Sequence, residues 1–262
     1  SEKQLFRRLG IPTAPFVAVD SEDDLVRAID EVGLPAVLKT RRYGYDGKGQ
    51  FVLREAADVR RAWAALGGAP LILEGFVAFD RELSIVAVRG RDGDIVCYPL
   101  VENHHRDGIL RRTIAPAPGV TASLQARAEA SARAVLEAFD YVGVLAIELF
   151  QRGDDLLANE MAPRVHNSGH WTIEGAETSQ FENHLRAICG FPLGSTAPRG
   201  HAAMLNLIGS VPPREAVLAV EGAHLHIYDK APRPGRKLGH VTVVAEDADQ
   251  VAKRFGKLER LV

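Results

Sequence analysis

The sequence has few cysteines, tryptophans and methionines, and no long apolar run. Each of these three residue types occurs twice in 262 residues. Cys97 and Cys189 are too few for a disulfide framework or a metal site, and apolar stretches such as 142–147 are too short to span a bilayer. The opening segment SEKQLFRRLG has no apolar core of the kind that a signal peptide needs. We therefore expect a reduced, cytoplasmic protein.

An excess of charge of one sign is also missing. The 32 Lys and Arg residues nearly balance the 34 Asp and Glu residues, which leaves a net charge of −2. Proteins that bind nucleic acid usually carry a basic patch or stripe, and no block of like charges marks a tail. We expect neither a nucleic-acid partner nor a membrane partner. The chain is long enough for one large or two modest domains with their own cores.

Short helices and short strands alternate along the chain. Capping residues and apolar periodicity predict helices at 1–10, 21–33, 57–66, 122–139 and 247–258. Strands are predicted at 35–40, 50–54, 71–77, 82–90, 94–103, 109–116, 142–151 and 155–164, with three more after residue 199. Polar and apolar residues partly alternate in the strands after residue 81, which is typical of antiparallel sheets. The pattern predicts an α+β fold with a large antiparallel component.

The most informative position is Glu148, a carboxylate inside an apolar strand. Burial of an unpaired carboxylate is costly, so Glu148 should have a partner. A turn centred near Gly153 and Asp154 places it opposite Asn159 or Glu160. Two carboxylates and an amide oxygen then converge, a donor set that suits Mg²⁺ carrying a nucleotide phosphate. The alternatives are a carboxylate pair neutralised by Arg or Lys, and a register that exposes one carboxylate.

The stretch TRRYGYDGKGQF places three glycines and a lysine between two strands. Gly44, Gly47 and Gly49 allow successive backbone N–H groups to turn toward an anion, and Lys48 adds positive charge. The stretch is not a P-loop, which needs four residues between its glycines and a Ser or Thr after the lysine. A glycine-rich hairpin is the alternative. The two interpretations are compatible, because a mobile hairpin can serve as a flap.

Four other features are compatible with a nucleotide or phosphate ligand. Lys39 ends an apolar strand and is a candidate phosphate ligand; the alternative is a lysine whose stem lies along apolar surface while its ammonium reaches water. The segment 74–77 is a candidate contact for the adenine edge; the alternative is that Glu74 is an ordinary carboxylate at a strand end. The loop 161–172 crowds Arg, two His, Asn and Ser after a strand, which favours binding of an anionic group. The basic turn 230–237 matches phosphate capture by Arg and Lys, or is a solvated surface turn.

Taken in order, these elements resemble the ATP-grasp superfamily. Within it, YDGKGQ, ENHHRDGILRRT, NEMAPRVHNSGHWT and RPGRKLGH resemble the 5-(carboxyamino)imidazole ribonucleotide synthetases of bacterial and fungal purine synthesis. The resemblance implies a small flap-bearing module at 1–78, a larger, mainly antiparallel module with the metal and nucleotide site at 79–198, and a C-terminal segment with a ribotide phosphate site at 199–262. Family members also carry an N-terminal α/β domain, which we expect this chain to lack. Tyr43 departs from the family flap, which often has glycine there.

The resemblance also implies an activity. An ATP-grasp ligase of this family uses ATP, Mg²⁺ and bicarbonate to carboxylate 5-aminoimidazole ribonucleotide through carboxyphosphate, and the family tends to form homodimers. The alternatives are another ATP-grasp carboxylase, a formate-using ribotide transformylase, and a nucleotide-binding fragment without turnover. Dependence on bicarbonate or on formate separates a carboxylase from a transformylase, and ATP binding without phosphate release, even with bicarbonate and ribotide supplied, identifies the third.

Residue roles follow from the same resemblance. The residues implied to face bicarbonate and the amine are Arg164, His166, Asn167 and Ser168. Those implied to hold the ribotide phosphate are Lys230, Arg236 and Lys237. The Mg²⁺ ligands are Glu148 and Glu160. Those implied to bind ATP are Lys39, Gly44, Tyr45, Asp46, Gly47, Lys48, Gly49, Gln50, Glu74, Gly75, Phe76, Val77, Glu82, His105, Asn159 and Glu160.

Overall fold

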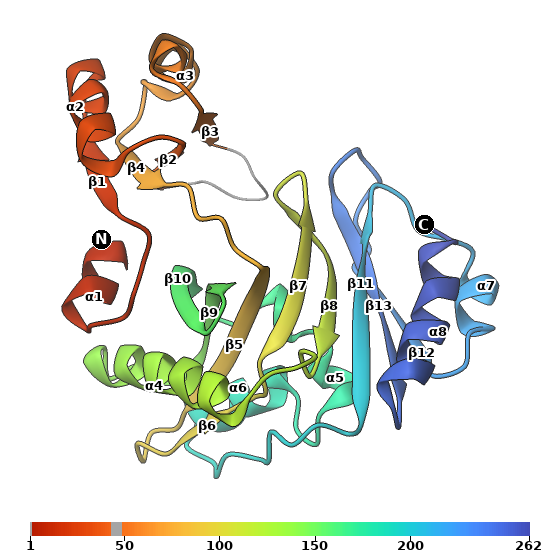
Figure 1. Ribbon diagram of the computed structural model, residues 1–262. Helices are drawn as coiled ribbons and strands as arrows, with labels where there is room; N and C mark the ends of the chain where they lie inside the picture. The colour runs from red at the N-terminus through yellow and green to blue at the C-terminus, as the bar shows by residue number, and fades with distance from the viewer. Residues whose placement is uncertain (1, 43–48) are drawn as a thin grey trace.

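The computed structural model describes residues 2–42 and 49–262, and in them the strands form two sheets (Figure 1). The smaller sheet has the strand order β1-β4-β2-β3. Its strands are β1 (Phe16–Val19), β2 (Ala36–Thr40), β3 (Gln50–Leu53) and β4 (Leu71–Gly75). The helical elements before and around it are α1 (Glu2–Arg8), α2 (Glu22–Val32), η1 (Ala56–Asp58) and α3 (Val59–Leu66). Apolar residues of α2 and α3 pack with those of the sheet in one core.

The larger sheet has the order β10-β9-β5-β7-β8-β11-β13-β12, and β6 pairs with β5. Its strands are β5 (Arg81–Arg89), β6 (Ile95–Cys97), β7 (Val101–Arg106), β8 (Ile109–Ala115), β9 (Gly143–Arg152), β10 (Asp155–Ala162), β11 (His201–Ile208), β12 (Ala223–Ile227) and β13 (Lys237–Ala245). The remaining helical elements are α4 (Ala122–Ala138), η2 (Asn167–Gly169), α5 (Thr172–Gly175), α6 (Gln180–Cys189), α7 (Arg214–Leu218) and α8 (Ala248–Glu259). Every pairing within both sheets is antiparallel.

This arrangement confirms the predicted α+β fold with a large antiparallel sheet. The strands of the small sheet lie before residue 76 and those of the large sheet begin at residue 81, while the exact boundaries 78/79 and 198/199 stay a prediction. The extended segment 76–80 joins the two parts (Figure 1). Among the described residues, no helix combines the length and apolarity that a membrane crossing requires.

One predicted strand is wrong in its extent. The segment 94–103 forms two strands, β6 and β7, with a break at 98–100. Pro99 has no N–H group to donate to the ladder. Tyr98 instead turns into the core, where its hydroxyl donates to the Thr178 carbonyl oxygen at 2.8 Å. Tyr98 still donates its backbone N–H group to the Val86 carbonyl oxygen of β5 at 2.9 Å, so the break follows it at Pro99.

The two faces of the large sheet are covered by different helices along β5 and β9. On one face, residues such as Leu83 and Leu149 pack against α4. On the other, Val86 and Ala146 are covered by Trp171 and residues of α6. Farther along that second face the apolar cover ends, and polar side chains follow. The candidate site begins there, on the part of the face toward the small sheet.

Candidate active site

The hairpin β9–β10 brings two carboxylates face to face. Arg152 pairs with Asp155 across a two-residue turn, as the sequence pattern predicted. The register then shifts between residues 158 and 160, so that Glu160 lies directly opposite Glu148 and Asn159 is the extra residue of a bulge. Directly opposed side chains in an antiparallel pair are close neighbours. The bulge therefore keeps both carboxylates on one face of the sheet.

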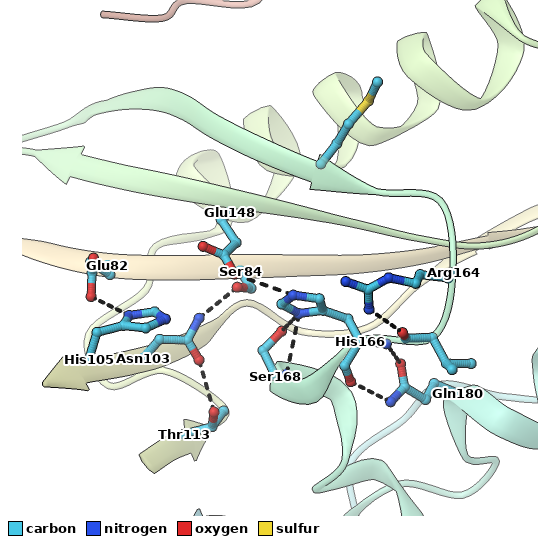
Figure 2. Close-up of polar contacts among 12 residues, drawn as sticks. Glu82, Ser84, Asn103, His105, Thr113, Glu148, Arg164, His166, Ser168 and Gln180 are labelled. Carbon is cyan, nitrogen blue, oxygen red and sulfur yellow. Dashed lines mark hydrogen bonds and ion pairs between the residues drawn. The ribbon is translucent and has the colours of Figure 1, made fainter. Parts of the chain in front are cut away.

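A chain of buried polar side chains continues from these carboxylates across the sheet (Figure 2). Ser84 on β5 is the strand neighbour of Glu148. The Asn103 side-chain amide donates to the Ser84 hydroxyl at 2.6 Å, and the Thr113 hydroxyl donates to the Asn103 carbonyl oxygen at 2.9 Å. All three are buried. Because they satisfy one another, they make a rigid polar floor beside Glu148.

Glu82 and His105 form an ion pair at the edge of this floor. The His105 Nδ1 atom lies 2.6 Å from a Glu82 carboxylate oxygen. Burial acts against a charged imidazole, but the hydrogen bond to Glu82 and the negative charges of Glu82, Glu148 and Glu160 outweigh it and raise the pKa of His105. Both side chains were expected to line the nucleotide pocket. The structure joins them to each other and places positive charge near the two carboxylates.

His166 lies in direct contact with Glu148. Its Nε2 atom lies 3.3 Å from Glu148, and its Nδ1 atom lies 2.8 Å from the Ser168 hydroxyl. Burial raises the pKa of Glu148, but the hydrogen bond and the charges of His166, His105 and Lys237 more than offset it, so the pKa is lowered. At Glu160, desolvation by the surrounding protein and the negative charge of Glu148 raise the pKa. The pKa values of the two opposed carboxylates are therefore pushed apart, and Glu160 is the one that takes up a proton more readily.

The loop that carries His166 is held by Gln180 of α6. The His166 N–H group donates to the Gln180 side-chain oxygen at 2.9 Å, and the Gln180 amide donates back to the His166 carbonyl oxygen at 2.7 Å (Figure 2). Arg164 is exposed and donates to the Val165 carbonyl oxygen. Both polar atoms of the Asn167 side chain are buried and have no hydrogen-bond partner among the described residues. Such an unsatisfied amide is costly unless a ligand or water completes it.

Lys39 and Glu74 come from the small sheet and reach the carboxylate hairpin. The Lys39 ammonium donates to Glu74 at 2.9 Å and to the Asn159 side-chain oxygen at 3.4 Å. Glu74 is buried, and the residues after it lead out along the connecting segment, where Phe76 is 48% exposed. Thus Lys39, Glu74 and Asn159, which are distant in sequence, form one polar cluster between the sheets.

The glycine-rich stretch is only partly described. Gly44, Tyr45, Asp46, Gly47 and Lys48 lie outside the described residues, as does Tyr43. Two positions that follow are described: the backbone oxygen of Gly49 accepts from the Thr40 N–H group at 2.8 Å, and Gln50 pairs with Lys39 in the ladder of β2 and β3. The stretch therefore starts and ends beside Lys39, and its predicted roles stay predictions.

The basic turn lies at the other end of the same face. Lys237 begins β13, and its positive charge reaches both Glu148 and His170, whose pKa values it helps to lower. Lys230 is exposed and lies over the Tyr228 ring at 5.1 Å, and Arg236 donates to the Ala231 carbonyl oxygen at 3.4 Å. Of the three expected phosphate ligands, Lys237 is the one that the structure brings electrostatically close to the carboxylates.

A divalent cation fits the donor chemistry of the hairpin. Glu148 and Glu160 offer carboxylate oxygens at opposed positions, and their mutual repulsion is what a cation relieves. The described residues contain no cluster of three or more His, Cys, Asp or Glu side chains that could hold a metal alone. The remaining ligands would be oxygens of a nucleotide and water, which is how Mg²⁺ is commonly held.

Several site residues escape prediction from the sequence. Ser84, Asn103 and Thr113 carry no motif, and Gln180 lies far along the chain from His166. The alternation of polar and apolar residues in β5 is a usable signal, because Ser84 shares a face with Glu82. The partners of Ser84 depend on which strands become neighbours, and that order cannot be read from spacing.

Comparisons with known proteins agree with this geometry. Residues 4–181 match the ATP-grasp domain family, and residues 202–254 match the phosphoribosylaminoimidazole carboxylase C-terminal domain. The N5-carboxyaminoimidazole ribonucleotide synthase of Pseudomonas aeruginosa is 57% identical over 261 residues, which are 100% of this chain and 72% of that protein. The Vibrio cholerae protein of the same name is 48% identical, over 98% of this chain and 69% of its own length.

Solved structures point to the same family. The N5-carboxyaminoimidazole ribonucleotide synthetase from Thermus thermophilus has a TM-score of 0.95 and 60% identity, and the match covers 100% of this chain and 71% of that chain. A synthase from Aspergillus clavatus, solved in complex with ADP and 5-aminoimidazole ribonucleotide, has a TM-score of 0.91 and 33% identity over 99% of this chain and 72% of its own. With fold, polar hairpin and sequence in agreement over nearly its whole length, this chain belongs to the N5-carboxyaminoimidazole ribonucleotide synthase family of ATP-grasp ligases.

Proposed function

We propose that this protein uses ATP and bicarbonate to carboxylate 5-aminoimidazole ribonucleotide on its amine, a step of de novo purine biosynthesis. The supporting observation is the opposition of Glu148 and Glu160 next to Lys39 and Asn159, in a member of this ligase family. The cluster combines oxygen ligands for a cation with a lysine for phosphate. That combination suits phosphoryl transfer, which needs positioning and charge neutralisation more than covalent chemistry.

The nucleotide binds between the two sheets in this proposal. Glu148 and Glu160 hold Mg²⁺, and Lys39 contacts a phosphate from the side of the small sheet. Mg²⁺ supplies charge neutralisation at the phosphate oxygens. The segment 74–77 contacts the adenine edge, and Glu82, oriented by His105, contacts the ribose.

The reacting groups lie toward the loop of His166. An oxygen of bicarbonate attacks the γ-phosphorus, and the bond from that phosphorus to the bridging oxygen of ADP breaks, which forms carboxyphosphate. In the direct route the ribotide amine attacks the carboxyl carbon of carboxyphosphate, phosphate leaves, and the nitrogen loses a proton. In the other route carboxyphosphate first breaks into CO₂ and phosphate, and the amine then attacks CO₂ and loses a proton. Arg164, His166, Asn167 and Ser168 face these reactants, and the unpaired amide of Asn167 is available to them.

The test is phosphate release from ATP by the full-length protein. We expect release that requires Mg²⁺, bicarbonate and 5-aminoimidazole ribonucleotide together, with formate unable to replace bicarbonate. Isotopic label from bicarbonate should appear in the ribotide product. Release that ignores the ribotide, or that needs formate, contradicts the proposed substrates. Nucleotide binding without any release identifies a binding protein instead.

Lys237→Ala should raise the KM for the ribotide about 10-fold to 100-fold, because one charge-assisted contact to a phosphate is lost. The KM for ATP should stay within about 3-fold. Steady-state kinetics with each substrate varied in turn gives both values. Arg233→Ala is the matched control, since Arg233 is an exposed cation of the same turn. An unchanged ribotide KM in Lys237→Ala removes this residue from the phosphate site.

The proposal includes two properties of the whole protein. We propose a homodimer, as the family resemblance implies, and a cytoplasmic location, where the nucleotide substrates of purine synthesis are found. Light scattering coupled to size exclusion measures the first. A monomer at micromolar concentration contradicts it and leaves the proposed reaction unaffected.

A further inference from the structure

Lys3 on α1 touches both sheets at the nucleotide cluster. Its side chain is only 7% exposed, and its ammonium lies 3.4 Å from a Glu74 oxygen on β4. The same ammonium donates to the Ala158 carbonyl oxygen on β10 at 3.2 Å. A buried lysine is costly unless it is paired, and here both partners adjoin residues that the proposed function uses.

The segment around α1 also covers the outer edge of β10. This strand is at the end of the large sheet, and on its outer edge the described residues provide only an isolated parallel bridge between Thr13 and Ala158. The Ala158 N–H group donates to the Pro12 carbonyl oxygen at 2.7 Å. The Met161 N–H group donates to the Glu2 carboxylate. Residues 2–12 thus form hydrogen bonds on both sides of the bulge at Asn159. In Figure 1, α1 is drawn between the small sheet and α4.

Two ammonium groups share one carboxylate oxygen at this junction. The ammonium groups of Lys3 and Lys39 lie 3.4 Å and 2.9 Å from the same oxygen of Glu74. The Glu2 carboxylate on the same helix adds negative charge near Lys3 and Glu74. Without Lys3, the negative charge of Glu74 would be balanced less, and Glu74 would hold Lys39 more firmly toward itself.

We infer that Lys3 is a positioning residue of the nucleotide site: it balances the charge of Glu74 so that Lys39 is left to bind phosphate, and it fastens Ala158 beside Asn159. The inference rests on the proposed roles of Lys39 and Glu74. Lys3 itself needs no contact with the nucleotide. Its effect is therefore on nucleotide affinity, through Lys39.

The test compares Lys3→Met with Lys3→Arg in the full-length protein. Arg8→Met is the matched control, because Arg8 is an exposed cation on the same helix. We measure the Kd for ADP by calorimetry, the KM for ATP, kcat and the melting temperature. Lys3→Met should raise the Kd and the KM about 10-fold, while Lys3→Arg, which keeps the charge, should stay within about 3-fold of the parent. Arg8→Met should change neither value.

A second comparison guards against loss of folding. In the Glu74→Gln background the carboxylate that Lys3 and Lys39 share is absent, so adding Lys3→Met no longer takes a partner away from a charged Glu74. The added change should then alter the Kd for ADP less than about 2-fold, which is the signature of coupled residues in a double-mutant cycle.

Two results would overturn the inference. The first is a Lys3→Met variant with parental Kd and KM, whether or not kcat and the melting temperature fall. The second is an equal loss of affinity in both backgrounds. Failure of the proposed function gives a different pattern: the parent binds ADP, and Lys3→Met still weakens that binding, but no ribotide-dependent phosphate release occurs.

Discussion

Glu160→Gln should remove nearly all ATP turnover while the protein stays folded. Glu160 is one of the two opposed carboxylates, and an amide is a much weaker ligand for Mg²⁺ than a carboxylate. Loss of metal-borne charge stabilisation of about 4 kcal/mol corresponds to a rate loss of about 10³-fold. The measurement is steady-state phosphate release at saturating ATP, bicarbonate and ribotide.

Stability should hardly change in the same variant. Glu160 is exposed as a residue, although its carboxylate is partly desolvated beside Glu148. Glutamine has nearly the same shape, and the change removes the repulsion from Glu148. Thermal unfolding checks this. Asp155→Asn is the matched control, because Asp155 is an exposed carboxylate on the same strand without a place in the cluster, and it should keep parental turnover. Normal phosphate release by Glu160→Gln in an active parent would mean that the metal assignment is wrong.

The second large effect concerns acid stability and a stack of histidines beneath the loop of His166. His170 and His226 lie on opposite sides of His240, with ring centroids 4.9 Å and 4.5 Å away. The Tyr228 hydroxyl lies 2.7 Å from His240 Nδ1. Burial, and then the neighbouring positive charges, lower the pKa of His170 from an ordinary 6.5 to about 4 and that of His240 to about 3.

These directions make the folded state sensitive to acid. Between pH 6.5 and pH 4 the unfolded chain protonates both histidines and the folded protein does not, so stability falls as pH falls. The folded protein has its full stability above about pH 6.5. At pH 5 each of the two histidines should lower the free energy of unfolding by about 2 kcal/mol relative to that value. Urea unfolding at pH 7.5, 6 and 5 measures the decline.

Two variants isolate this contribution. His240→Gln cannot titrate at this position, so its stability should decline less steeply between pH 6.5 and pH 5. His224→Gln is the control, because His224 is exposed, and it should keep the parental slope. Burial raises the pKa of Glu2 to about 7, so this carboxyl makes the folded protein more stable as pH falls, opposite to the two histidines. Because Glu2 is present in every variant, comparing their slopes cancels its influence. Equal slopes in parent and His240→Gln would contradict the prediction.

Local patterns in the sequence predict the elements well because each depends on near neighbours. The Ser21 cap, with its side chain accepting from the Asp24 N–H group, and the hairpin turn after Arg152 are set by a few adjacent residues. The pairing of Glu148 with Glu160 follows from that turn. The bulge decides between Asn159 and Glu160, and spacing alone left both possible.

The sequence by itself determined the antiparallel α+β fold, the carboxylate hairpin and, through its motifs, the family. Only the tertiary structure decided which distant groups share charge: Lys3 and Lys39 on Glu74, Asn103 on Ser84, and Gln180 around His166. The physical reason is that hydrogen bonds and ion pairs between remote segments depend on strand order and on which face each residue occupies. Those contacts exist only after the whole chain has packed.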